Sequence, residues 1–328
     1  MLPQGEASGG LRCSGGLDSP LRYVSDWMYD NDQGPDGALS PSGEQDDWGR
    51  DAAREAALSR YRYDVAQDAR RVRLRQLLGG PAPVSWALIV VIVLVYVWFL
   101  VLEWRLQGAV KHSPFLSLYT AANWAQLIAD EGQYYRLVTS IFLHASPPHL
   151  IVNGYAIYAA GFALERMVGG ARYWLIILGA GLAGNLASMV FSGVPSVGIS
   201  GSIFGVIGAL FVVSRKYRDD LPDEFAARLR RTTVQVTLIN LGIGVVIPRI
   251  DNTAHIGGLI GGVVVALVLG SLFTETKERA FWVRVVALLS LVATIYAATP
   301  LRREIHRCLG STTAMERCYS AYLSTNGE

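Results

Sequence analysis

The chain has 328 residues, of which 51% are hydrophobic and 17% are charged, and it contains 34 glycines and long uninterrupted apolar runs. A soluble protein would leave such runs unburied, so the composition is typical of a polytopic membrane protein. The formal net charge of +2 is small, and the basic residues cluster beside apolar runs instead of forming a separate patch. This charge pattern excludes nucleic acid as an expected partner.

The amino-terminal arm, residues 1–83, is expected to be cytosolic and largely disordered. Residues 1 to about 43 are rich in Gly, Ser, Asp and Pro and have few aliphatic side chains. The first five residues lack the basic and apolar regions of a cleavable signal peptide, so the first span is expected to target the chain. The polar stretch 44–78 can form a helix and ends in the basic run RRVRLR at 70–75. A basic run beside a span marks the cytoplasmic side of a membrane.

Seven apolar segments are expected to cross the membrane. The first has 19 residues and would rise roughly 28 Å as a helix, close to the ~30 Å thickness of the hydrocarbon layer. The expected spans are 84–102, 148–164, 173–191, 200–213, 234–247, 252–269 and 280–298. The connection from 103 to about 140 mixes several Trp and Tyr residues with moderate polarity, which favours an element in the membrane interface. A lumenal loop or part of a wet vestibule remains an alternative for this connection.

The distribution of Lys and Arg among the loops favours a cytoplasmic amino terminus. The expected inner loop between the fourth and fifth spans carries six basic residues within 215–231, whereas the outer loops after the third and fifth spans hold none and Arg249. One conflict remains, because an odd number of spans places the tail outside, and the tail carries Arg302, Arg303, Arg307 and Arg317. Late segments have less influence on topology, so we keep this orientation.

Polar residues cluster at the outer ends of the second, fourth and sixth spans. In the second span, His149 and Asn153 are four residues apart and share one helical face. The fourth span begins at Ser200, between the glycines of VGISGSIFGVIG at 197–208, and the sixth contains His255 about one turn in. Ionisable groups inside a span are costly and usually functional, so these four residues are candidates for one site.

The residue types at this depth suit nucleophilic catalysis. A hydroxyl needs a base near pH 7, and imidazole is the side chain that titrates nearest that pH, so His255 is the natural partner of Ser200. An oxyanion would need donors, which the Asn153 amide, the His149 ring and the backbone N–H groups of the fourth helix can supply. Asp251 is expected to cap the sixth helix, which leaves a Ser–His dyad and no triad.

The residue types and their spacing alone leave other roles open for these side chains. Buried histidines often serve packing, and His144, at the rim, is expected to be structural or to hold water. His149 and Asn153 fit a packing role as well as a catalytic one. Metal binding by the three histidines competes with the serine mechanism, but there is no carboxylate or thiolate among them and no His-Glu-x-x-His spacing. These absences weaken the metal-binding alternative, which stays open at this point.

Taken together, several motifs resemble those of the rhomboid intramembrane serine proteases. They are RLVTSIFLH at 136–144, His149 with Asn153, Gly161 with Glu165, GISG at 198–201 and AHIGG at 254–258. The resemblance covers about residues 84–273 and leaves the arm and the tail unaccounted for. It implies a six-helix core at 84–273, to which a seventh transmembrane helix at 280–299 and a short exterior tail at 300–328 are appended.

The resemblance also implies a role for each matching residue. Ser200 is similar to the nucleophile and His255 to the general base, whereas His149 and Asn153 match the oxyanion side of the site. His144 matches a position on the water-retaining side. Phe204 falls where the family commonly places an aromatic ring against the histidine, and Glu165 and Arg136 match structural positions. The YYR sequence at 134–136 departs from a frequent Trp-Arg pair, which concerns the packing of the interfacial element.

The function that the resemblance implies is hydrolysis of a peptide bond within or just outside a transmembrane helix of a protein substrate, through an acyl-enzyme and with no metal or cofactor. Substrate helices are expected to enter laterally, between the second and fifth spans, from the lipid bilayer. The alternatives are a non-proteolytic member that binds transmembrane clients, against which the intact Ser200 and His255 argue, and a small transporter. A transporter is expected to show repeats or broken midplane helices, and none is visible in the sequence. The absence of a transit peptide favours a bacterial plasma membrane.

Two further patterns carry expectations. Gly257, Gly258, Gly261 and Gly262 form two overlapping Gly-x-x-x-Gly pairs, which should let the sixth span approach the fourth. Cys308 and Cys318 in the exterior tail are expected either to close a short disulfide loop or to stay free, whereas Cys13 in the cytosolic arm should stay reduced.

Overall fold

The computed structural model describes residues 43–105, 115–192, 194–247, 250–269, 277–309, 318 and 320. The chain divides into two compact units, 1–61 and 62–328, and all contacts discussed below lie within the second. The region expected to be disordered, residues 1 to about 43, and most of the tail beyond 309 lie outside the described residues. All secondary structure in the described part consists of helices apart from one isolated β-bridge, which confirms the predicted all-α fold class.

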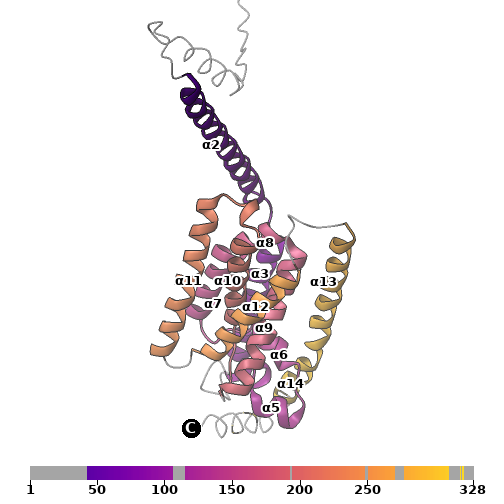
Figure 1. The fold of residues 1–328 in the computed structure, drawn as a ribbon. Coiled ribbons are helices and arrows are strands. Elements are labelled where there is room, and N and C mark those ends of the chain that lie inside the picture. The colour runs from indigo at the N-terminus through magenta and orange to yellow at the C-terminus, as the bar shows by residue number, and fades with distance from the viewer. Residues whose placement is uncertain are drawn as a thin grey trace, which may run out of the picture. The chain divides into compact units, whose positions relative to one another are not determined.

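Each of the seven expected spans coincides with a helical segment (Figure 1). The helices are α3 (Pro83–Arg105), α7 (Pro147–Ala156) continued by the π-helical turn η2 (Ile157–Gly161) and α8 (Phe162–Val168), α9 (Gly170–Phe191), α10 (Ser200–Lys216), α11 (Asp223–Val246), α12 (Asn252–Leu269) and α13 (Lys277–Ala297). Among the described residues, four helical stretches are long and apolar enough to cross a membrane: Trp48–Trp104, which includes α3 up to its last residue but one, Gly170–Phe191, Asn252–Leu269 and Ala280–Leu309.

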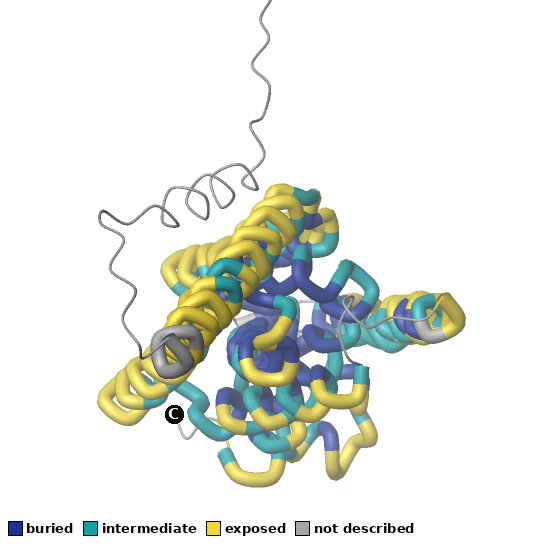
Figure 2. The backbone as a smooth tube through the Cα atoms, turned by 45° about the horizontal axis from the view of Figure 1, so that its top comes forward, coloured by how far each residue is buried: buried dark blue, intermediate teal, exposed yellow. Residues whose placement is uncertain are grey.

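Helix α10 forms the centre of the bundle. Of its 17 residues, 13 are buried, from Gly201 through Ser214, because α10 is apolar around its whole circumference and other helices surround it. Figure 2 shows the buried backbone gathered in the middle of the bundle, whereas α2 (Gly43–Leu78) is exposed along most of its length. Helix α13 joins the periphery of the bundle, where the indole N–H of Trp174 on α9 donates to Ser290 Oγ at 3.0 Å.

Glycines bring α12 against two neighbouring helices at backbone distance. A Cβ on Gly258 would lie 2.6 Å from the carbonyl carbon of Gly201, and a Cβ on Gly262 would overlap the backbone of Gly205, so this pair faces α10 as predicted. The other pair, Gly257 and Gly261, does not face α10. A Cβ on Gly257 or Gly261 would instead overlap α9, at Ala187 and Ala183. A helix wedged between two others needs small residues on both contacting faces, which explains the doubled motif.

The connection from 103 to 140 is largely helical where the structure describes it. It contains α4 (Phe115–Ala121), α5 (Ala125–Glu131), α6 (Arg136–Thr139) and the 3₁₀ turn η1 (Ser140–Phe142). Arg136 is 1% exposed, and its guanidinium donates to the carbonyls of Tyr119 and Ala122 at 2.7 and 3.2 Å. This buried cation fastens the end of α4 to α6, so the connection is a built element rather than a free loop.

Carboxylates fix the start of two spans. The Glu165 side chain accepts the backbone N–H groups of Val84 and Ser85 at 2.9 and 2.7 Å, which satisfies two of the otherwise unpaired donors in the first turn of α3. Asp223 begins α11 and accepts the Tyr63 hydroxyl of α2 at 2.7 Å. This hydrogen bond holds the pKa of the Asp223 carboxyl below its ordinary value.

Beyond α13 the chain forms α14 (Thr299–Leu309), where only a tail was expected. The structure joins Cys308 of this helix to Cys318 in a disulfide, which resolves the open alternative in favour of a closed loop. Both cysteines are buried in a small apolar cluster with Ile305, Leu116 and Leu143.

Candidate active site

Ser200 is the first residue of α10 and follows a sharply bent segment. Gly198 has φ +120°, a conformation that a residue with a side chain rarely adopts. The bend directs the chain into α10 so that the first N–H groups of a buried helix, which have no partner within the helix, surround Ser200. A hydroxyl at this position lies beside preorganised donors for negative charge.

His255 meets Ser200 across the tight contact between α10 and α12. The His255 Nε2 and Ser200 Oγ atoms are 3.0 Å apart, within hydrogen-bonding distance. The ring of Phe204, one turn beyond Ser200, stacks on the His255 imidazole with centroids 4.2 Å apart and planes inclined by 12°. His255 is 8% exposed, and its Nδ1 has no hydrogen-bond partner among the described residues.

Asp251 stabilises α12 and forms no hydrogen bond with the imidazole ring of His255 in the described structure. Its Oδ1 accepts the backbone N–H groups of Thr253 and Ala254 at 3.1 and 3.0 Å, as an N-cap does. The geometry is therefore that of a Ser–His pair without a carboxylate partner on the histidine within the described residues.

His149 and Asn153 lie against the bend that precedes Ser200. A Cβ added to Gly198 would be 2.9 Å from His149 Nε2 and 3.6 Å from Asn153 Nδ2, so both polar groups face the same short stretch of backbone. The Ser146 hydroxyl caps α7 by accepting the His149 N–H at 3.4 Å. Asn153 is 5% exposed, and its Nδ2 has no partner among the described residues, so this amide is free to donate.

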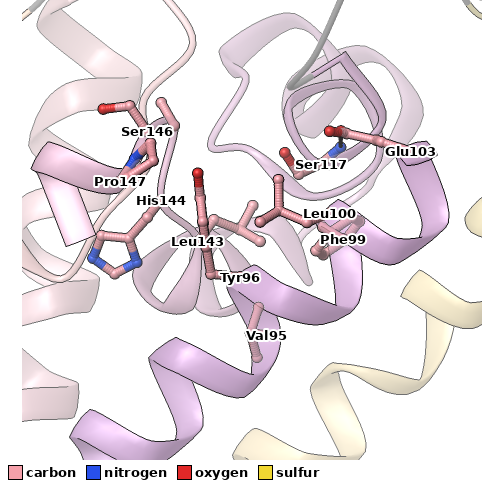
Figure 3. Close-up of a pocket in the computed structure, with 11 residues that line it drawn as sticks. Val95, Tyr96, Phe99, Leu100, Glu103, Ser117, Leu143, His144, Ser146 and Pro147 are labelled. Atoms are coloured by element: carbon pink, nitrogen blue, oxygen red, sulfur yellow. Dashed lines mark hydrogen bonds between the residues drawn. The ribbon is translucent and has the colours of Figure 1, made fainter. Parts of the chain in front are cut away.

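His144 lies beside His149 and forms no hydrogen bond with Ser200 or His255 in the described structure. The His144 and His149 rings meet edge to face, with centroids 5.1 Å apart. His144 is 3% exposed and borders a cavity of about 180 Å³ between α3 and the 143–147 segment. In Figure 3, His144 and Ser146 lie on one side of this cavity, and Ser117 and Glu103 lie on the other.

A polar network that the sequence reasoning missed holds the segment before Ser200. Asn123 and Ser196 form an antiparallel bridge, with N···O distances of 2.9 and 3.0 Å, and the Gly198 N–H donates to the Ser140 carbonyl at 2.9 Å. Asn185 of α9 donates to Ser140 Oγ at 2.9 Å. An asparagine inside an apolar span is the one signal in the sequence that pointed to this network.

The chain is similar to known proteins over the region that carries these residues. Residues 131–272 match the model of the Rhomboid domain. The chain is 42% identical over 163 residues to rhomboid protease GluP of Bacillus subtilis, which covers 50% of this chain and 31% of that protein. It is 33% identical over 181 residues to putative rhomboid protease YdcA of the same organism, which covers 54% of this chain and 86% of that protein.

A third relative carries a different name. Inactive rhomboid protein 2 of Homo sapiens is 33% identical over 162 residues, which covers 49% of this chain and 19% of that protein. The similarity therefore reaches both proteases and an inactive protein, and the chain spans less than a third of the length of GluP. Family membership does not depend on this distinction, because the match to YdcA covers most of that protein. The chain is an integral membrane protein and belongs to the rhomboid family.

Proposed function

We propose that this protein is an intramembrane serine endopeptidase in which Ser200 is the nucleophile and His255 the general base. The observation that carries the proposal is the 3.0 Å contact between Ser200 Oγ and His255 Nε2 at the start of a buried helix. A nucleophile and a base within hydrogen-bonding reach, with the base held by a third group, are the structural signature of covalent catalysis. Here the third group is the stacked ring of Phe204.

In the first half of the reaction, the Ser200 hydroxyl gives its proton to His255 Nε2 as Oγ bonds to the substrate carbonyl carbon. The tetrahedral intermediate then collapses, the C–N bond breaks, and His255 returns the proton to the leaving amine. The product is an acyl-enzyme on Ser200. In the second half, a water molecule gives a proton to His255 Nε2 as its oxygen bonds to the acyl carbon. The bond from this carbon to Ser200 Oγ then breaks, His255 returns the proton to Oγ, and the carboxylic acid product leaves.

The negative charge on the carbonyl oxygen would be stabilised by the groups around the Gly198 bend. Asn153 Nδ2 is a buried donor without a partner in the described structure, His149 Nε2 is directed at the same backbone, and the first N–H groups of α10 complete the set. Removing one such donor from a serine protease typically lowers kcat by about 10²–10³-fold. We assign His144 to the side that retains water, because it borders the cavity beside α3.

We propose that the substrates are transmembrane proteins that enter laterally between α7 and α11. Helix α11 buries only Ala226 and Thr233 among its described residues, and both lie in its first half. Its second half exposes apolar side chains such as Val245 and Val246, which are 81% and 80% exposed. A weakly packed apolar segment near the site is suited to admit another helix from the bilayer. We further propose that the protein resides in the plasma membrane with its amino terminus in the cytoplasm.

The proposal is tested by cleavage of a single-span substrate in proteoliposomes, with and without a chelator. Wild-type protein should cleave in both conditions, and Ser200→Ala should not cleave. Ser202→Ala is the matched control, because it removes a different hydroxyl from the same helix. The Ser202 hydroxyl donates to the Ile177 carbonyl at 2.8 Å and not to His255. Cleavage by Ser200→Ala, or loss of cleavage with the chelator, would contradict the serine mechanism.

The second candidate function is binding of transmembrane clients without proteolysis. It is favoured by the similarity to inactive rhomboid protein 2, which covers 49% of the chain. If folded wild-type protein cleaves none of several substrates yet retains them in a pull-down to the same extent as Ser200→Ala, this second function replaces the first.

A further inference from the structure

Helix α14 is fixed to the bundle by one apolar face. The apolar residues recur at the spacing expected for one side of a helix and pack with the end of α3, with α4 and with the segment before His144. On α14 these residues are Leu301, Ile305, Cys308 and Leu309, and their partners include Phe99, Leu116 and Leu143. Because this face is packed, the opposite face of α14 points away from the bundle in a fixed orientation.

The outward face of α14 carries an open hollow with a cationic lining. Thr299, Arg302, Arg303 and His306 line it. Neither Arg302 nor Arg303 forms an ion pair with any residue that the structure describes, and both are exposed. The one acidic residue on this helix is Glu304, whose carboxylate lies 3.6 Å from Arg307 instead. The guanidinium groups of these two adjacent residues therefore both line the hollow, and no acidic residue in the described part of the chain neutralises their charge.

The hollow lies where the chain leaves an apolar helix. Helix α13 belongs to a stretch that is long and apolar enough to cross a membrane, and Tyr296, near its end, is 77% exposed. Exposed tyrosines at the end of a span mark the level of the lipid headgroups. Thr299 follows Tyr296 by three residues, and its hydroxyl donates to the Tyr296 carbonyl at 2.8 Å, so the hollow begins within one turn of this level.

We propose that this hollow binds the phosphate group of an anionic membrane lipid. Guanidinium groups match phosphate oxygens in a paired geometry, and a site at headgroup depth meets lipid phosphate at high local concentration. This assignment also gives Arg302 and Arg303 a role that does not depend on which side of the membrane they occupy. It does not rest on the proposed proteolysis, because the ligand binds on the opposite face of α14 from the one that packs near His144.

The experiment titrates the purified full-length protein in detergent with phosphatidylglycerol, phosphatidylcholine or inorganic phosphate and counts bound molecules by native mass spectrometry. Each basic residue near an anionic surface contributes about fivefold in affinity, so Arg302→Gln with Arg303→Gln should weaken phosphatidylglycerol binding about 25-fold. Arg302→Gln or Arg303→Gln alone should weaken it about fivefold. Arg307→Gln is the matched control for these single variants, because it removes one positive charge from the same helix outside the hollow and should change binding much less. Thermal unfolding of each variant establishes that α14 stays folded.

Three outcomes would overturn the proposal. The first is equal affinity for phosphatidylglycerol and phosphatidylcholine, which would remove the role of headgroup charge. The second is an equal loss of binding in the Arg307→Gln control and in each of the single variants Arg302→Gln and Arg303→Gln, which would show that only the net charge of the helix matters. The third is binding of inorganic phosphate with no lipid bound, which would make the hollow a site for soluble anions. Lipid binding that weakens in the double variant and falls with added salt supports the proposal.

Discussion

Substituting Gly258 by alanine tests whether the backbone contact between α10 and α12 sets the reactive geometry. The new Cβ would lie 2.6 Å from the Gly201 carbonyl carbon and 2.9 Å from its Cα, whereas ordinary contacts begin at 3.4 Å. The two helices must therefore separate by roughly an ångström, at a cost of about 1–3 kcal/mol for overpacking. Gly201 adjoins Ser200, and Gly258 lies three residues beyond His255, so the 3.0 Å contact lengthens with the helices.

The expected result is a loss of about 100-fold in kcat/KM for cleavage of a model substrate, since a misplacement of about 1 Å typically costs that much. Gly242→Ala is the matched control, because a Cβ on this helical glycine of α11 would meet nothing within 4 Å. Both variants should be compared at equal amounts of folded protein, measured by thermal unfolding in the same detergent. Normal cleavage by well-folded Gly258→Ala would refute the argument that this contact positions the pair.

Three further predictions follow from other parts of the molecule. Asn153→Ala should lower kcat by about 10²–10³-fold with little change in KM, measured on the same substrate, and an unchanged kcat would remove Asn153 from the oxyanion donors. Asp223→Asn should speed amide exchange in the part of α2 around Tyr63. In the wild type the protection of these amides, expressed relative to their intrinsic exchange rate, should fall only as the pH drops through the lowered pKa of Asp223, because the contact needs the carboxylate. Equal protection above and below this pKa would contradict the prediction. Reduction of the Cys308–Cys318 disulfide should speed exchange in α14 while the bundle stays folded, and maleimide labelling of either cysteine in intact cells without reductant would show that the bridge is absent.

The parts of the fold that local sequence determines were predictable. An apolar run of the right length forms a helix wherever it is buried in lipid or protein, so the expected spans coincide with helices to within a few residues, except at the start of α11, which begins at Asp223. The juxtaposition of Ser200 and His255 was also predictable, because residues at the same end of neighbouring spans share a depth. Depth alone does not determine which face of a helix a residue occupies.

The features that sequence reasoning missed all depend on contacts between distant segments. The network of Asn123, Ser140 and Asn185 joins three segments that are far apart in the chain, and no local spacing encodes it. The second glycine pair of α12 was assigned to the wrong neighbour because a Gly-x-x-x-Gly pattern specifies a close contact but not its partner. Helix α14 was missed because its apolar face is completed only by residues of α3, α4 and the segment before His144.

Because no carboxylate bonds His255 Nδ1 within the described structure, the orientation of the imidazole ring must be fixed by other contacts. In a triad the acid orients the imidazole by a hydrogen bond, whereas here Phe204 stacks on the ring and glycine contacts fix the helix that bears it. Orientation then depends on packing, which is short-ranged and steep with distance, and much less on charge. If Ser200 and His255 react as proposed, buried substitutions between α9, α10 and α12 should slow the reaction as strongly as loss of an oxyanion donor. Changes of surface charge near the site should have little effect.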